Sequence, residues 1–309
     1  MKPFDYLAPR TLAEAVDALA KYNGQARMIA GGTDLLLKMK AGRLAAKAVI
    51  NIKRIPELRC LSFESHLTLG ALTTLEELRR SPIIRQHYPA LAEAAATMAS
   101  VQIRNLATVG GNLCNAAPSA DLAPILIALN AIVRIAGPGG ERRIPLSDFF
   151  TGPGTTVLAP DELMAALKVP RPTGPALYLK HSPREHMDIA VVGVGLSLRW
   201  GSSSTATPTS GGTLRATATP TPTCESARVV LGAVAPTPLR AQRAEAELLG
   251  GPLSAERIER AAKLAAEEAK PIDDVRGSAW YRRRMVEVMT RRGLMSLSQT
   301  PSVSETLGA

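Results

Sequence analysis

The spacing of apolar residues in the first 55 positions predicts a small βαβ-like unit. Apolar side chains recur at helical spacing over residues 11–21, behind a threonine and a glutamate placed for a capping box. Strand-sized apolar runs cover residues 26–30 and 48–51, and residues 33–39 between them have a helical pattern. We expect this unit to form the first lobe of a larger domain.

A second lobe is predicted from residue 56 to about residue 175. Strands are expected at residues 67–72, 131–136 and 162–169, and helices at residues 74–80, 89–98 and 124–129. A Pro-Gly-Gly turn follows the middle strand, and the Pro-Arg-Pro sequence at residues 170–172 interrupts the pattern. The domain boundary is therefore placed near residue 175.

The remaining residues predict a third unit, an α+β domain over residues 176–292. Strands are expected at residues 178–181, 189–200 and 227–232, and helices at residues 239–249, 254–269 and 279–292. Residues 201–223 are rich in Ser, Thr, Pro and Gly, so we expect a disordered insert in a hairpin. Residues 293–309 are expected to form a flexible tail.

Composition excludes several classes of protein. No apolar run reaches the roughly 18 residues that span a bilayer, and the first residues lack the apolar stretch of a secretory signal. Three dispersed cysteines fit neither a disulfide framework nor a metal site, so a reducing cytoplasm is expected. The net charge of +10 comes with only 4% aromatic residues, and the basic residues are scattered. This pattern argues against nucleic-acid binding and leaves a docking surface for an acidic partner, or a solvated helix face, as explanations.

Two glycine pairs about 80 residues apart are the best clue to function. They are Ala30-Gly31-Gly32-Thr33-Asp34 and Thr108-Val109-Gly110-Gly111-Asn112, each beside or within an apolar run that has the character of a strand. Paired glycines let a main chain approach a ligand closely and aim successive N–H groups at one point. Such concavities bind anions, so the two pairs predict a nucleotide diphosphate held from two sides.

Other nucleotide signatures are absent from the sequence. No G-x-G-x-x-G motif opens a βαβ unit, and there is no P-loop motif and no G-x-S-x-G elbow. Asp121 follows the second glycine pair by ten residues and could accept hydrogen bonds from a ribose or from a neighbouring loop. The alternative for Asp121 is a helix N-cap, since an apolar helical run follows it.

Five segments together resemble the FAD-binding medium subunit of the molybdenum hydroxylases. They are residues 29–35 (IAGGTDL), 102–113 (QIRNLATVGGNL), 119–122 (SADL), 231–240 (LGAVAPTPLR) and 274–282 (DVRGSAWYR). That family includes the flavoproteins of xanthine dehydrogenase and carbon monoxide dehydrogenase. The resemblance implies a two-subdomain FAD-binding domain of the vanillyl-alcohol-oxidase (PCMH) type, followed by a CO dehydrogenase flavoprotein C-terminal-like α+β domain.

The resemblance also implies a set of cofactor-binding residues. The first glycine loop would surround one side of the FAD diphosphate, and the second pair would hold it from the other lobe. Met98 and Ala99 would line the flavin or its chain, Asp121 the adenosine side, and Leu163 with Met164 the adenine. The implied set is Met28, Ile29, Ala30, Gly31, Gly32, Thr33, Asp34, Met98, Ala99, Thr108, Gly110, Gly111, Asn112, Asp121, Leu163, Met164 and Lys180.

Lys180 lies in the segment that resembles the family's sequence near the isoalloxazine. A cation there can stabilise negative charge on the flavin and raise its reduction potential. The alternative is a surface lysine at the start of a strand. No His or Cys lies in the first glycine motif, so FAD is expected to bind non-covalently. Cys114 lies where one branch of the family begins an iron–sulfur loop, but no further cysteine occurs before Cys224, so no such cluster is expected.

The resemblance implies an electron-transfer subunit of a heteromeric oxidoreductase. It would take electrons from a small [2Fe-2S] subunit and pass them to NAD, a quinone or oxygen. Substrate would be oxidised on a large molybdopterin subunit, and no catalytic residue or metal ligand is assigned to this chain. Two alternatives stay open: a free-standing FAD-dependent oxidoreductase of the same fold, and a module without redox activity that binds a nucleotide or an acidic partner.

Overall fold

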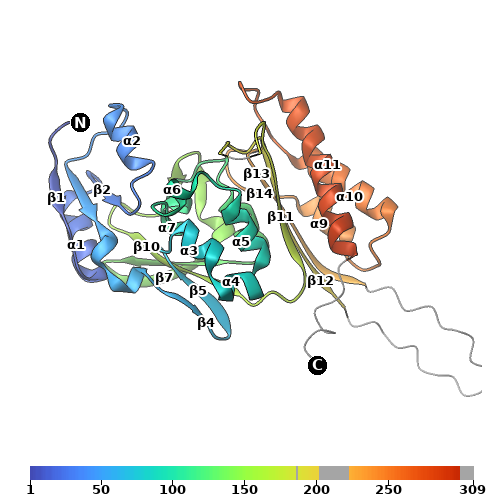
Figure 1. The fold of residues 1–309 in the computed structure, drawn as a ribbon, viewed down its shortest axis with the longest axis horizontal. Helices are drawn as coiled ribbons and strands as arrows, with labels where there is room; N and C mark the ends of the chain where they lie inside the picture. The colour runs from blue at the N-terminus through green and yellow to red at the C-terminus, as the bar shows by residue number, and fades with distance from the viewer. Residues whose placement is uncertain (186, 202–222, 300–309) are drawn as a thin grey trace, which may run out of the picture.

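The computed structural model describes residues 1–185, 187–201 and 223–299 of the 309-residue chain, which form three consecutive units (Figure 1). The first lobe is a parallel three-stranded sheet of order β1-β3-β2. Its elements are β1 (Asp5–Leu7), α1 (Leu12–Tyr22), β2 (Ala26–Ile29), α2 (Leu35–Lys40) and β3 (Ala48–Asn51). The predicted βαβ unit is confirmed. Strand β1 was not predicted, because its three residues show no apolar alternation and stay largely exposed.

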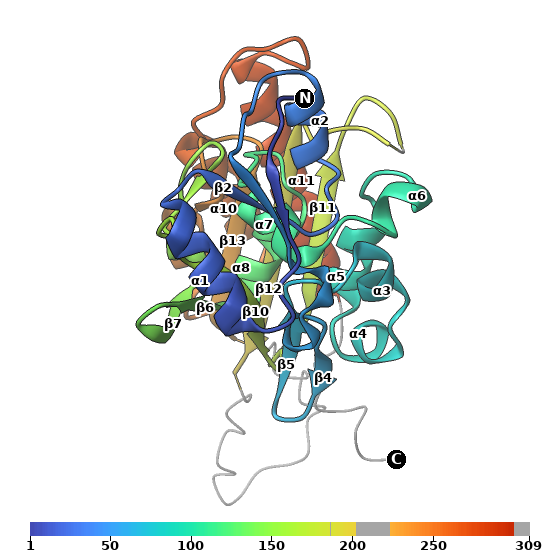
Figure 2. The same ribbon diagram turned by 90° about the vertical axis from the view of Figure 1, so that its left-hand side faces the viewer.

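The second lobe is an antiparallel sheet of order β4-β5-β10-β6-β7, with short helices beside it. The strands are β4 (Leu61–Phe63), β5 (His66–Gly70), β6 (Ile132–Gly137), β7 (Gly140–Pro145) and β10 (Leu163–Pro170). The helices are α3 (Leu75–Arg80), α4 (Pro82–His87), α5 (Pro89–Ala96), α6 (Val101–Arg104), α7 (Val109–Cys114) and α8 (Leu122–Ala128). Figure 2 shows α3, α4 and α6 gathered on one side of the molecule.

Short elements complete this lobe. They are the 3₁₀ turns Ile52–Arg54, Pro56–Leu58 and Leu146–Asp148, and the small hairpin of β8 (Phe150–Gly152) and β9 (Thr155–Thr156). Helix α3 begins at a complete capping box formed by Thr74 and Glu77.

The third unit is an antiparallel sheet of order β11-β12-β13-β14, and helices α9, α10 and α11 cover its outer face (Figure 1). The elements are β11 (Ala176–His181), β12 (Val192–Trp200), β13 (Cys224–Gly232), β14 (Leu239–Arg240), α9 (Gln242–Leu248), α10 (Ala255–Glu268) and α11 (Ala279–Ser298). Helix α8 of the second lobe packs on the inner face. A Cβ at Gly195 would lie 2.6 Å from the Pro124 carbonyl, so glycine in β12 permits this close packing.

Three predictions about local structure need correction or fall outside the description. Gly110 and Gly111 do not adjoin a strand: both lie in the first turn of α7, where Thr108 supplies the N-cap. The tail does not start at residue 293, because α11 continues to Ser298 and buries Leu294 and Leu297 in the C-terminal core. Residues 202–222 and 300–309, which include most of the expected insert and tail, lie outside the described residues. Within the described residues, no helix is long and apolar enough to cross a membrane.

Candidate functional site

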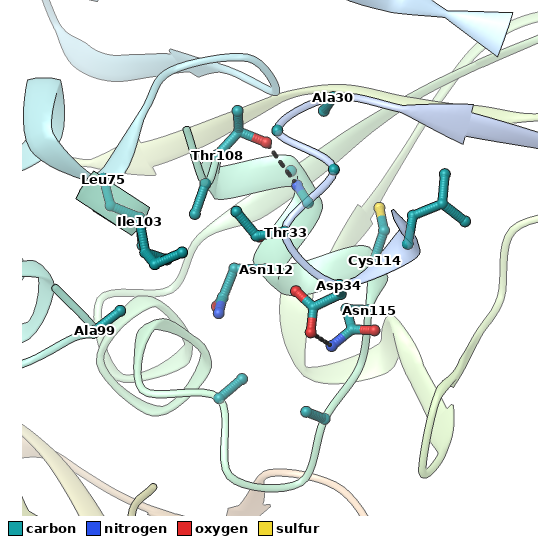
Figure 3. Close-up of a pocket in the computed structure, with 18 of the residues that line it drawn as sticks. Ala30, Thr33, Asp34, Leu75, Ala99, Ile103, Thr108, Asn112, Cys114 and Asn115 are labelled. Atoms are coloured by element: carbon teal, nitrogen blue, oxygen red, sulfur yellow. Dashed lines mark hydrogen bonds between the residues drawn. The ribbon is translucent and has the colours of Figure 1, made fainter. Parts of the chain in front are cut away.

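A cavity of about 840 Å³ opens where loops of the first two lobes meet strand β11 (Figure 3). All but two of the seventeen predicted cofactor residues line it, the exceptions being Ile29 and Leu163. Leu163 and Met164 are neighbours on β10, and successive side chains of a strand point to opposite faces, so only Met164 reaches the cavity. The side chain of Ile29 packs under the first glycine loop, beside Gly32.

The first glycine loop brings an unpaired row of main-chain donors to the cavity. Within the described chain, the N–H groups of residues 31–34 donate no hydrogen bond to protein. Gly32 has a φ of +74°, which turns the loop sharply. A Cβ at Gly31 would lie 2.7 Å from the carbonyl carbon of Leu106 and nearer still to its oxygen. The loop is therefore packed directly on the second lobe, with its donors left for a ligand.

The second glycine pair has a different role from the one predicted. The N–H groups of Val109 and Gly110 bind the carbonyl oxygens of Thr73 and Ala71, each at 2.9 Å. The N–H of Gly111 donates to the Thr108 hydroxyl at 3.0 Å, and the N–H of Asn112 donates to the Thr108 carbonyl at 2.9 Å. These donors are already satisfied inside the protein. The glycines are needed because Ala71 and the Thr108 cap lie against their α-carbons.

Asn112 supplies the polar group that α7 leaves for a ligand. Its Oδ1 is buried and has no hydrogen-bond partner among the described residues. Buried polar atoms without partners are uncommon in folded proteins and call for an explanation such as a missing ligand. Figure 3 shows the Asn112 side chain in the cavity, between Ala99 and the loop that carries Thr33 and Asp34.

A pair of hydrogen bonds joins the two lobes at the rim of the cavity. Lys38 Nζ donates to Asn115 Oδ1 at 2.7 Å, and Asn115 Nδ2 donates to Asp34 Oδ1 at 3.2 Å. The Asp34 carboxylate is therefore used between lobes. Sequence reasoning missed Asn115 and Lys38, because neither residue lies in a glycine motif and their contact spans 77 positions.

A buried arginine holds the turn that carries Met98 and Ala99. Ala99 has a φ of +43°, and Arg104 Nη1 donates to the carbonyl oxygens of Met98 and Ala99 at 2.8 and 2.9 Å. Arg104 Nε also binds the buried Glu76 carboxylate at 3.0 Å. Hydrogen bonds from Arg79, and then from Arg104 and Arg80, lower the pKa of Glu76 to about 2. Neither Glu76 nor Arg104 was predicted as a site residue, although Arg104 lies in one of the five resembling segments.

Asp121 and Lys180 form a buried ion pair on the cavity wall. Lys180 Nζ donates to Asp121 Oδ2 at 3.1 Å and to the Thr97 carbonyl at 3.2 Å, and its side chain is 7% exposed. Tyr178 donates to Asp121 Oδ1 at 2.7 Å. Burial raises the pKa of Asp121, and the charge of Lys180 opposes that rise. The surface-lysine alternative for Lys180 is wrong. So is the N-cap alternative for Asp121, because its side chain makes no cap hydrogen bond.

Cys114 lines the cavity as a free, packed thiol. Its Sγ lies 3.8 Å from the sulfur of Met164, and burial raises the pKa of the thiol to about 12. A neutral thiol of this kind is a poor nucleophile and a poor metal ligand. Cys114 therefore contributes packing and shape to the wall.

Nearly the whole chain matches two families that follow one another. Residues 2–172 match the FAD binding domain in molybdopterin dehydrogenase, and residues 177–297 match the CO dehydrogenase flavoprotein C-terminal domain. The chain belongs to the FAD-binding medium-subunit family of xanthine and CO dehydrogenases. The resemblance inferred from the five segments is thereby confirmed, as are the fold class and the assignment to the oxidoreductases.

Relatives of this flavoprotein family align over nearly the full chain. The carbon monoxide dehydrogenase medium chain of Hydrogenophaga pseudoflava is 34% identical over 94% of this chain and 96% of its own. The putative xanthine dehydrogenase FAD-binding subunit of Escherichia coli is 32% identical, with 93% of each chain covered.

Solved structures show the same fold. A carbon monoxide dehydrogenase of Hydrogenophaga pseudoflava that lacks the Mo-pyranopterin moiety superimposes with a TM-score of 0.86, at 34% identity and covering 96% of this chain and 98% of the other. Quinoline 2-oxidoreductase from Pseudomonas putida superimposes with a TM-score of 0.85, at 27% identity and covering 97% and 99%.

The cavity fits the cofactor of this medium-subunit family. Its volume lies in the upper part of the usual range for cofactor sites, about 300–1,000 Å³. Four N–H groups in residues 31–34 and the Asn112 oxygen have no partner in the part of the chain that the structure describes; the N–H groups suit the oxygens of a diphosphate, and the Asn112 oxygen suits a donor on the same ligand. Lys180 adds a positive charge to the wall.

Proposed function

We propose that this chain binds FAD non-covalently in the cavity and is the electron-transfer subunit of a heterotrimeric molybdenum hydroxylase-type dehydrogenase. It receives electrons from a small [2Fe-2S] subunit and passes them to an external acceptor, namely NAD, a quinone or oxygen. Substrate is oxidised on a large molybdopterin subunit, and the assembly is cytoplasmic. The observation that carries the proposal is that residues 31–34 and Asn112, from two lobes, meet at one cavity, where their polar groups have no partner among residues 1–185, 187–201 and 223–299.

Different residues of the cavity bind different parts of FAD. The N–H groups of residues 31–34 bind the diphosphate, and the Asn112 amide binds it or the adjoining chain. The Met98–Ala99 turn and Met164 supply apolar walls for the rings. Lys180 places a positive charge beside the cofactor. Bound FAD supplies the exchange between one-electron and two-electron carriers.

Exposed apolar side chains support the need for a partner. Residues 272–280, which lead into α11 and include its first two residues, form an exposed apolar segment: Val275 is 99% exposed, Trp280 is 74% exposed and Ile272 is 71% exposed. Contiguous exposed apolar residues are a usual mark of a protein interface. Tyr281, next to Trp280, bonds to His181 at 2.8 Å, and His181 directly follows Lys180 on β11. The apolar segment therefore lies against β11, the strand that carries Lys180 on its opposite face, and we expect an electron donor to dock beside this strand.

Two measurements test the proposal. Apoprotein titrated with FAD should give a stoichiometric yellow complex, and a colourless product after reconstitution would favour the module without redox activity. In an anaerobic experiment, a reduced [2Fe-2S] subunit should bleach the flavin, while small organic substrates alone should not. Bleaching by a small substrate without partners would instead indicate a free-standing oxidoreductase.

A variant separates partner docking from cofactor binding. Trp280→Ser should lose co-purification with the other subunits and keep its FAD, because Trp280 is exposed and does not line the cavity. Retention of both partners by this variant would exclude the apolar segment as the interface. Tyr6→Ser is a matched control, since Tyr6 is also exposed, at 61%, but lies in the first lobe.

A further inference from the structure

The buried Asp121–Lys180 pair has a third member that belongs to no glycine or cofactor motif. Tyr178 is 5% exposed, and its hydroxyl donates to Asp121 Oδ1 at 2.7 Å, while Lys180 Nζ binds the other oxygen at 3.1 Å. Asp121 and Lys180 line the cavity, and Tyr178 does not. We propose that Tyr178 is a positioning residue for the cofactor site: it fixes the Asp121 carboxylate so that Lys180 presents its remaining N–H to the bound FAD. This inference rests on the proposed FAD site.

Lys180 keeps one ammonium N–H that has no partner among the described residues. An ammonium group has three N–H donors, and Lys180 uses two, one on Asp121 and one on the Thr97 carbonyl at 3.2 Å. The third has no partner among the described residues, although the side chain is buried in the wall. These two hydrogen bonds fix the orientation of the Lys180 ammonium. The direction of its third N–H therefore depends on the position of the Asp121 carboxylate.

Tyr178 fixes the position and rotation of the Asp121 carboxylate. A carboxylate with one oxygen on Lys180 alone can still rotate about its Cβ–Cγ bond. The phenol bond to the second oxygen removes this freedom. The Tyr178 hydroxyl is itself fixed, because the side chain lies between the sheet and the second lobe as part of the larger core. The three groups therefore form a chain of contacts in which Tyr178 acts on the cofactor only through Asp121 and Lys180.

A glycine in the neighbouring strand makes room for the hydroxyl. Gly193 on β12 pairs with Lys180 on β11, and a Cβ at Gly193 would lie 2.7 Å from the Tyr178 oxygen. The ring carbons would be 3.4 Å away, at ordinary contact. Glycine weakens a strand interior, so its presence here has a local reason. The absent Cβ at Gly193 therefore leaves room for the hydroxyl of Tyr178, which a phenylalanine would not need.

A double-mutant cycle on the full chain tests the proposal. The FAD dissociation constant is measured by flavin fluorescence for the wild type, Tyr178→Phe, Lys180→Met and the double variant. Tyr178→Phe should weaken FAD binding about tenfold, the usual scale for a hydrogen bond to a charged group. In the Lys180→Met background, the same change should alter binding by less than about twofold, because its effect passes through Lys180. Equal factors in both backgrounds would refute a positioning role and leave Tyr178 as a structural residue.

Control variants keep the result interpretable. Tyr22→Phe removes a tyrosine–carboxylate bond of 2.8 Å to Asp5, away from the cavity, and should leave FAD binding unchanged. If Lys180→Met does not fold, Gly193→Ala replaces it in the cycle, because the added methyl displaces the Tyr178 hydroxyl. Gly193→Ala should weaken FAD binding about tenfold, and adding Tyr178→Phe should then change binding less than twofold. Additive losses would again overturn the inference, whereas a wild type that binds no FAD would refute the proposed function itself.

Discussion

The close approach of the two lobes at Gly31 gives the sharpest prediction. In Gly31→Ala, the new methyl carbon would lie 2.7 Å from the Leu106 carbonyl carbon and 3.0 Å from the Ala107 Cα. Ordinary contact begins at 3.4 Å, and both neighbours are main-chain atoms that cannot rotate away. The first glycine loop must therefore move off the second lobe by roughly 1 Å, an estimate that follows from the stiffness of packed interiors.

The expected loss of FAD-binding free energy can be derived from the N–H groups of the first glycine loop. Residues 31–34 offer four N–H groups that no described residue accepts, and hydrogen bonds to a charged ligand contribute about 1.5–3 kcal/mol each. If the displacement breaks two of them, about 3–6 kcal/mol of binding free energy is lost. Since about 1.4 kcal/mol corresponds to a tenfold change, the FAD dissociation constant should rise by roughly 100-fold to 10,000-fold.

The assay is titration of apoprotein with FAD, followed by flavin absorbance and fluorescence, for Gly31→Ala and a matched control. Gly139→Ala is suitable, because a Cβ at Gly139 would meet nothing within 4 Å and the residue lies in the turn between β6 and β7, away from the cavity. The control should bind FAD as the wild type does. A Gly31→Ala dissociation constant within threefold of the wild type would refute the reasoning, since it would show that loop position does not control the cofactor.

Three further predictions rest on other contacts of the chain. Gly32→Val and Gly111→Val should both purify without flavin, which the absorbance of the purified proteins checks. Gly32 has a φ of +74°, which strains a β-branched residue, and a Cβ at Gly111 would lie 2.9 Å from the Thr108 hydroxyl. Replacing residues 202–222 by Asn-Gly should leave flavin content unchanged, because Gly201 and Thr223 are already joined by a hydrogen bond of 2.8 Å. Glu76 has a lowered pKa, so its contribution to stability is present above about pH 4.5 and is lost as the pH falls toward 2; thermal unfolding of Glu76→Gln should therefore depend less on pH in that window than the wild type does.

For the two glycine pairs, the sequence could predict their location at one site but not the contacts of both pairs. Both pairs were expected at one ligand site, and the structure places both on the same cavity. Among the described residues, the N–H groups of residues 31–34 have no protein partner, as a ligand-binding loop requires, whereas those of Gly110 and Gly111 bond to the protein. A pair of glycines in the sequence shows only that a Cβ is not tolerated. It does not show whether a ligand or another part of the chain, here Ala71, occupies that space.

The residues that sequence reasoning missed share a physical reason. Asn115, Glu76 and Tyr178 reach the site through contacts over 28 to 81 positions, and no local pattern of spacing encodes such pairs. Arg104 was part of a resembling segment, but only the fold shows that it binds the carbonyl oxygens of the Met98–Ala99 turn. Periodicity predicts which face of an element is buried, whereas these contacts depend on how the lobes are packed.

The cavity wall joins two domains, and this affects how the chain can work. Residues 31–34 and Asn112 belong to the region matched as an FAD binding domain, whereas Lys180 belongs to the region matched as the C-terminal domain. Lys180 reaches the site because β11 packs against the second lobe, with Tyr178 inside the larger core. The C-terminal sheet therefore supplies part of the cavity wall. The same strand leads to His181, whose bond to Tyr281 connects it to the exposed apolar segment before α11. Under the proposed function, a partner bound at that segment would lie against the strand that carries Lys180, so β11 would be a direct physical link between the docking surface and the cavity.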